Sequence, residues 1–233
     1  MRENPKEQTN LFEILKGYFR YLENLGISEI PFSQELSFLF KEREKISGDT
    51  LEALFEKISK CEDCRLSRIR KQPVLDSSYE NKKLMLIGDF PDRDDDYFGR
   101  PFSGSIKEVL QKMLFAIGLK KEDFYISLTV KCKPPAGRIP EEEEIEACKK
   151  YLLKEIKLLK PKLILALGFI PPKVFMEKPD TFSSIRGKPF TYKESTIIFT
   201  YHPSYMLKNP SVKRLIWEDL KTFKRLYEEV IGH

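Results

Sequence analysis

Four cysteines are the residues of this chain whose spacing most directly indicates chemistry. Cys61 and Cys64 form a C-x-x-C pair, Cys132 follows a strand-like run, and Cys148 lies in a helical stretch. A group that uses every cysteine, with a close pair at one end, is typical of a metal site. Zinc and a [4Fe–4S] cluster both accept four thiolates, and the wide spacing of the second two cysteines favours the cluster. The alternative is four unrelated thiols, two of them buried as small hydrophobic residues.

Two further segments carry candidate functional residues. The segment 88–105, GDFPDRDDDYFGRPFSGS, begins with residues that suit a tight turn close to a ligand. Its acidic run is most simply interpreted as a solvated loop. Phe102 lies in this segment, where an aromatic ring must cover the core or stack on a ligand. His202, the only histidine besides the terminal His233, follows a strand-like run and precedes a proline, which favours a functional role over a structural one.

The elements that must position these residues alternate along the chain. Strand-length apolar runs alternate with helical patterns from residue 82 onward, which predicts an α/β domain. We expect three layers, α/β/α, around a central, mainly parallel four-stranded sheet. Ligands bind at the carboxyl ends of the strands in such sheets, where both segments lie. The expected strands are 84–87, 124–130, 163–167 and 196–200, and the expected helices are 105–117, 141–159, 170–177 and 211–230.

Helical spacing also marks residues 9–25 and the stretch after Pro31, while the polar segment 47–49 separates these from a third helix that starts after Thr50. We therefore predict an N-terminal helical appendage at 1–48 and an α/β domain at 49–233.

Composition sets broad limits on the class of protein. The chain has 233 residues, with 41 basic and 36 acidic side chains and a net charge of +5. This mild excess permits a nucleic-acid partner, although a solvated mixed-charge surface explains it equally simply. The sequence contains neither an apolar run that could span a membrane nor a secretory signal, so we expect a cytoplasmic protein.

Taken together, the motifs resemble those of family 4 uracil-DNA glycosylases, over about residues 58–230. This resemblance implies a base-excision DNA-repair enzyme that hydrolyses the N-glycosidic bond of a flipped base, with uracil as the expected base and DNA as the partner. It also implies a structural [4Fe–4S] cluster on the four cysteines. The matching segments are Cys61 and Cys64, GDFP at 88–91, GRPF at 99–102, KCKPP at 131–135, Cys148, ALG at 166–168, RGK at 186–188 and TYHPSYML at 200–207.

The resemblance assigns a role to each candidate residue. Phe102 is expected to stack on the flipped base, and His202 to donate a hydrogen bond to its carbonyl group. Asp89 is expected to act at the sugar, with Asp94 or Asp95 as alternatives. The base pocket would also include Gly88 and Phe90, and the N-terminal helices are candidates for contacts with other repair or replication proteins. The wedge and DNA-contact residues would be Ser204, Met206, Leu207, Lys208, Lys213 and Arg214.

Some residues depart from the family pattern. Leu128 occupies the position of an asparagine that reads the polar edge of uracil in the family, and leucine has no group that can do so. Phe90 and Asp92 replace an alanine and a glycine in the turn after the first strand. These changes keep two alternatives open: a glycosylase for another deaminated base, and a DNA-binding member without catalysis. The presence of Phe102, His202 and the acidic segment favours catalysis.

Overall fold

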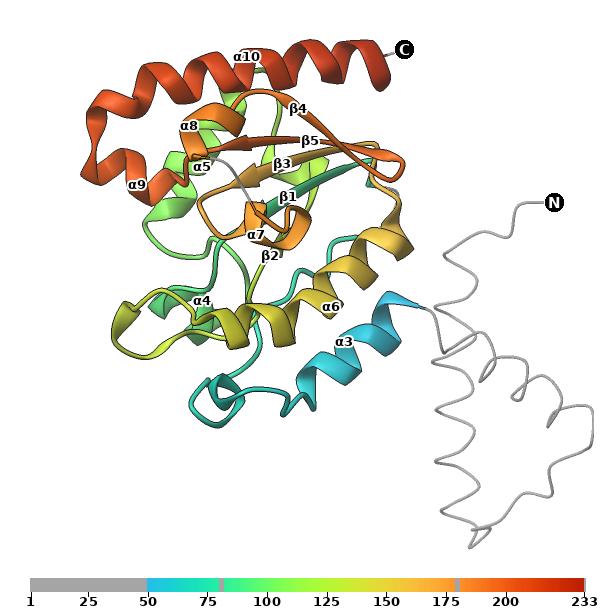
Figure 1. Ribbon diagram of the computed structural model, residues 1–233, viewed down its shortest axis with the longest axis vertical. Helices are drawn as coiled ribbons and strands as arrows, with labels where there is room; N and C mark the ends of the chain where they lie inside the picture. The colour runs from blue at the N-terminus through green and yellow to red at the C-terminus, as the bar shows by residue number, and fades with distance from the viewer. Residues whose placement is uncertain (1–49, 80–81, 179–180, 233) are drawn as a thin grey trace, which may run out of the picture. The chain divides into compact units, whose positions relative to one another are not determined.

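The structure, a computed structural model, describes residues 50–79, 82–178 and 181–232. These residues belong to one compact unit that spans Asp49–His233 (Figure 1). The predicted helical appendage at 1–48 lies outside the described residues, so the appendage and its partners stay predictions. Within the described ranges, none of the helices has the length and apolar character needed to cross a membrane.

A five-stranded sheet forms the centre of this unit (Figure 1). The strands lie in the order β2-β1-β3-β5-β4, and all neighbours run parallel except β4, which is antiparallel to β5. The predicted α/β class and mainly parallel sheet are confirmed, and the predicted four strands are corrected to five. The strands are β1 (Leu84–Gly88), β2 (Phe124–Leu128), β3 (Leu163–Leu167), β4 (Pro189–Tyr192) and β5 (Ser195–Thr200).

The additional strand, β4, forms a hairpin with β5 at the edge of the sheet. It begins at Pro189, and its residues alternate between exposed and half-buried. An edge position tolerates a proline, because that strand need not donate hydrogen bonds on both sides. The turn residue Lys193 adopts a positive φ of 52°, although hairpin turns usually place Gly or Asn there. The short strand and the unusual turn residue explain why the apolar pattern did not reveal it.

Helices cover both faces of the sheet (Figure 1). Side chains alternate between the faces along each strand. Leu86 therefore packs with α5 (Ile106–Phe115) and α10 (Lys213–Val230), while Ile87 packs with α6 (Glu142–Leu159). This arrangement is the predicted α/β/α sandwich. The remaining helices are α3 (Leu51–Ser59), α4 (Arg93–Phe98), α7 (Pro171–Phe175), α8 (Phe182–Ile185), α9 (Pro203–Lys208) and the 3₁₀ turns Arg65–Arg68, Lys121–Asp123, Pro135–Gly137 and Pro210–Val212.

The acidic run after β1 forms helix α4 and not the solvated loop expected from its composition. Asp92 caps the helix by accepting a hydrogen bond from the backbone N–H of Asp95, and the Asp95 carboxylate in turn accepts one from the backbone N–H of Asp92. Acidic residues in a first turn also interact favourably with the helix dipole. Asp95 and Asp96 are buried. The run is therefore part of the framework around Phe102.

Candidate active site

Two strand ends and one aromatic ring form the floor of the candidate site. Gly88 at the end of β1 lies beside Leu128 at the end of β2. A Cβ atom on Gly88 would lie 2.7 Å from Leu128 Cδ2 and 2.8 Å from Phe102 Cζ. Carbon atoms do not approach so closely, so a glycine at this position lets the ring and the leucine close over the strand end. The side chains of Phe102 and Leu128 are buried, with 3% and 2% of their surface exposed.

The backbone of Phe102 has a left-handed conformation, with φ of 53°. This conformation is costly for a bulky residue and persists only where neighbours hold it. The buried Asp95 carboxylate holds it by accepting a hydrogen bond from the backbone N–H of Ser103 at 2.7 Å. Burial raises the pKa of Asp95 to about 6. The resemblance offered Asp95 as an alternative to Asp89 at the sugar; in the structure its carboxylate binds the backbone that positions Phe102.

His202 lies against this ring. The His202 and Phe102 rings stack with centroids 5.5 Å apart and an angle of 22° between their planes. The backbone N–H of Ser204 donates to His202 Nδ1 at 3.2 Å, and Ser204 Oγ lies 2.7 Å from the same nitrogen. A ring nitrogen that accepts from an N–H carries no proton itself, so in the neutral ring Nε2 carries it.

Burial also fixes the charge of this histidine. It lowers the pKa of His202 to about 4, so the ring is neutral at pH 7. The structure therefore presents a neutral imidazole with one oriented N–H donor, at the carboxyl end of β5. Such a donor can stabilise negative charge that develops on a bound group without transferring its proton.

Asp89 follows β1 directly, and its carboxylate is held against the turn after β3. Its Oδ1 accepts a hydrogen bond from the backbone N–H of Ile170 at 2.8 Å. A Cβ atom on Gly168, where φ is +113°, would lie 2.1 Å from Asp89 Oδ2, so that position requires glycine. Burial raises the pKa of Asp89 to about 7, against the opposing effect of the N–H groups of Ile170 and Phe169. This carboxyl group therefore changes its charge near neutral pH.

Two other predicted site residues have different neighbours. Phe90 packs with the buried Cys132 and its surroundings, whereas Phe102 and Leu128 belong to another core group. Asp94 is half-exposed, and its carboxylate lies 3.5 Å from Arg93 Nε. Phe90 therefore lies on the cysteine side of the turn after β1, and the half-exposed Asp94 side chain lies over Gly104, where an added Cβ atom would be 2.4 Å from Asp94 Oδ2.

A buried ion pair fixes the strand that leads to His202. Arg186 Nη2 lies 2.6 Å from Asp219 Oδ1 on α10, and the Thr200 hydroxyl donates to Asp219 Oδ2 at 2.6 Å. A Cβ atom on Gly187 would lie 2.2 Å from Asp219 Oδ1. Arg186 and Gly187 thus contact Asp219 and hold α10 against the end of β5. The RGK motif marked this position in the sequence, but its partner Asp219 had no signal of its own.

The four cysteines come together at one end of the domain, although they are far apart in the sequence. Cys61, Cys64, Cys132 and Cys148 line one cavity together with Arg70. No disulfide links them. Burial raises the pKa of Cys132, and raises that of Cys148 to about 12. The side chains therefore face one enclosed space, as the spacing predicted.

Arg70 and Lys131 support this group, and the spacing of the cysteines gave no signal for either. Arg70 Nη1 donates to Cys132 Sγ at 3.1 Å, while Nη2 donates to the carbonyl oxygen of Cys61 at 3.1 Å. The backbone N–H of Lys131 donates to Cys148 Sγ at 3.3 Å. Both residues direct N–H groups at the cavity wall. Such donors stabilise thiolates.

The side chain of Lys131 links the cysteine cavity to the floor of the candidate site. Its ammonium group lies 2.8 Å from Glu155 Oε2 and donates to the Leu128 carbonyl oxygen at 2.8 Å. Only 1% of each charged side chain is exposed. Removing one member of such a buried pair costs about 3–5 kcal/mol. The pair therefore fixes the end of β2, which carries Leu128, relative to the cysteines.

The predicted DNA-contact residues lie on α9 and at the start of α10. Ser204 and Met206 are half-buried, the first against His202 and the second against the core. Leu207 is 55% exposed. The charged members point into solvent. They are Lys208, Lys213 and Arg214, the last of which lies 3.7 Å from Glu218.

Comparison with known proteins gives the family of this fold and site. Residues 76–221 match the family described as the uracil DNA glycosylase superfamily. The chain belongs to this superfamily. It is 38% identical over 187 residues to a type-4 uracil-DNA glycosylase of Sulfurisphaera tokodaii, a match that covers 76% of this chain and 85% of the relative.

Two further type-4 uracil-DNA glycosylases give similar values. The one from Pyrobaculum aerophilum is 34% identical over 181 residues, covering 74% of this chain and 92% of the relative. The one from Thermotoga maritima is 33% identical over 180 residues, covering 76% and 94%. The resemblance read from the motifs, to the type-4 members of the superfamily, is therefore confirmed.

Proposed function

We propose that this protein is a DNA glycosylase of base-excision repair that hydrolyses the N-glycosidic bond of uracil in DNA. The stacked pair of Phe102 and His202 carries this proposal, because it combines an aromatic platform with a neutral, oriented N–H donor. The names of the type-4 relatives support the same reaction and the same base.

The departure of the base is the first chemical requirement. An enzyme of this class takes the target nucleotide out of the duplex. The flipped base would stack on Phe102, which requires the ring to become accessible when DNA binds, since only 3% of Phe102 is exposed without DNA. As the bond between the sugar carbon C1′ and the base nitrogen N1 breaks, its electron pair moves onto the base. The Nε2–H of His202 would stabilise the resulting negative charge at a carbonyl oxygen, and one such donor contributes about 10²–10³ in rate.

The sugar then carries positive charge, and a water molecule attacks C1′. We assign Asp89 to this side of the reaction. Its ionised carboxylate would stabilise the oxocarbenium-like sugar and accept the proton that the water loses when the new C–O bond forms. The hydrogen bond from Ile170 and the packing on Gly168 hold the carboxylate in one orientation. Asp94, which is half-exposed, is the weaker candidate.

We further propose that Cys61, Cys64, Cys132 and Cys148 hold a [4Fe–4S] cluster. The donor set fits such a group, since four thiols face one cavity and Arg70 and the Lys131 backbone direct N–H groups at two of the sulfurs. The role of the cluster when bound would be structural, joining the chain before β1 to α6.

DNA is the proposed partner, and the cytoplasm the proposed location. Leu207 at the exposed end of α9 would enter the space left by the flipped base, and the neighbouring cations would contact phosphates. Thiols stay reduced in the cytoplasm, as cluster ligands require.

One assay panel tests the proposal. Iron-loaded protein is incubated with duplexes that carry uracil, hypoxanthine or xanthine and with single-stranded uracil DNA, and abasic sites are scored. We expect abasic sites in the uracil substrates. Release of only another base would support the alternative glycosylase, and DNA binding without any release would support the non-catalytic alternative.

A further inference from the structure

A groove of about 480 Å³ lies between α5, α9 and α10, separate from the floor of the candidate site. Its walls are mostly apolar and include Met113, Met206 and Ile216. Trp217 on α10 also lines it and is 43% exposed. An indole that remains this exposed beside an apolar groove offers a flat face for stacking.

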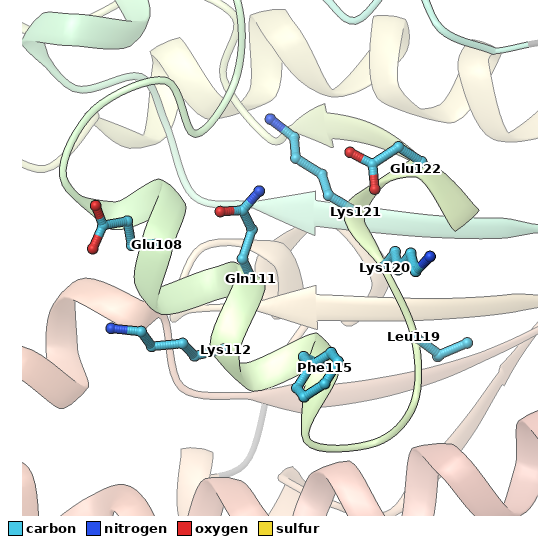
Figure 2. Close-up of a pocket in the computed structure, with 8 residues that line it drawn as sticks. All are labelled: Glu108, Gln111, Lys112, Phe115, Leu119, Lys120, Lys121 and Glu122. Atoms are coloured by element: carbon cyan, nitrogen blue, oxygen red, sulfur yellow. The ribbon is translucent and has the colours of Figure 1, made fainter.

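The charges in this groove have one sign. Lys112 and Lys213 line it from opposite elements, α5 and α10, and its lining includes no carboxylate. A neighbouring hollow between α5 and the segment 119–122 differs (Figure 2), because Glu108 and Glu122 line it among its lysines. The groove beside Trp217 is therefore the one whose chemistry suits an anion that carries a flat apolar group.

The groove is also continuous with α9, since Met206 and Leu207 belong to its lining. These are residues for which we propose contact with the DNA at the flipped base. We infer that the groove binds an unstacked nucleotide of the DNA, with its base on Trp217 and its phosphates at Lys112 and Lys213. This inference rests on the proposed function only in taking DNA as the ligand. Aromatic stacking combined with flanking cations is the usual way in which single strands are bound without sequence preference.

The chain provides its own probe for this site, because Trp217 is its only tryptophan. Full-length protein is titrated with single-stranded oligothymidylate, which contains no uracil, and the tryptophan emission is recorded. We expect saturable quenching as a base stacks on the indole. Lys112→Ala and Lys213→Ala should each weaken the binding, and each should lower the slope of log affinity against log salt by about 0.7. Lys157→Ala, an exposed change on α6 across the sheet, is the matched control and should change neither.

A second measurement follows the DNA and not the protein. With labelled oligothymidylate and fluorescence anisotropy, Trp217→Ala should weaken binding about 5- to 150-fold, while Trp217→Phe should retain most of it. Thermal melting checks that both variants are folded. Saturation by anisotropy without quenching, or equal affinity of Trp217→Ala and the parent, would overturn the inference and leave the groove to a protein partner. The titration does not depend on bond cleavage. Excision of uracil without quenching would therefore refute only nucleotide binding in the groove, whereas quenching without excision would refute only the proposed reaction.

Discussion

Leu128→Asn tests how the base pocket discriminates. In the proposed pocket Leu128 lies at the strand end beside Gly88 and Phe102, where it leaves the polar edge of the base without a partner. An asparagine there would supply a donor and an acceptor worth about 1–3 kcal/mol of pairing. Through the exponential relation between barrier and rate, this corresponds to about 5- to 150-fold faster excision of uracil. We expect a smaller gain for hypoxanthine, whose edge differs.

The same substitution has a cost that follows from burial. Leu128 is 2% exposed and packs in the core. Truncating such a leucine costs about 2–5 kcal/mol, and an amide without a partner costs about 1–3 kcal/mol. The free energy of unfolding should therefore fall, and activity must be compared at a temperature where the variant stays folded.

Ile126→Asn is the matched control for this experiment. Ile126 lies two residues earlier on the same strand and in the same core group, and it is 1% exposed. It should carry a similar loss of stability without any gain in excision. The assay is single-turnover release of uracil and of hypoxanthine from duplexes, by protein of equal iron content. An equal change for both bases, or wild-type discrimination already as strong as that of an Asn-bearing relative, would refute the role given to Leu128.

Three further predictions concern the cofactor, the pH dependence and the DNA contacts. Purified protein should be brown with about four irons per chain, and Cys132→Ser should lower its melting temperature; colourless protein with stoichiometric zinc would contradict the cluster. Because burial raises the pKa of Asp89 from 3.8 to about 7, excision should increase as the pH rises through about 7. The free energy of unfolding should fall between these two pKa values, because only the folded state then holds the proton. If the Asp89→Asn variant shows the same pH dependence of excision and of stability, the ionisation belongs to another group. If Lys208, Lys213 and Arg214 contact phosphates, removing each should reduce the salt slope of duplex binding by about 0.9 without altering base preference, and three unchanged slopes would move the DNA-binding face elsewhere.

Local sequence patterns were sufficient to predict the main elements of the fold. The buried parallel strands are continuous apolar runs, and the predicted strand 163–167 matches β3 at both ends. β4 was not predicted because its residues alternate only between exposed and half-buried at the edge of the sheet. α4 escaped because the acidic side chains that suggest a solvated loop are there used to cap a helix and to bind backbone N–H groups.

Candidate site residues could be predicted where they follow strands. Their hydrogen-bond partners could not be predicted, because the fold brings these together from distant parts of the sequence. Phe102 and His202 could be proposed from their positions after strands. The tautomer of His202 depends on the Ser204 N–H, and the support of the cysteines depends on Arg70, whose guanidinium bonds across a wide sequence separation. Periodicity and spacing carry no information on such contacts, because they follow from packing.

The most direct test of the proposed function is the single-turnover rate of uracil release by iron-loaded protein, measured for the parent chain and for His202→Ala. We expect the parent to release uracil and to leave an abasic site. The rate should be about 10²–10³ lower for the variant, which loses the neutral Nε2–H donor. The two proteins should bind duplex DNA with similar affinity, because the proposed role of His202 is in the chemical step. Absence of uracil release by the parent would contradict the proposed function, and equal rates in the two proteins would contradict the role given to His202.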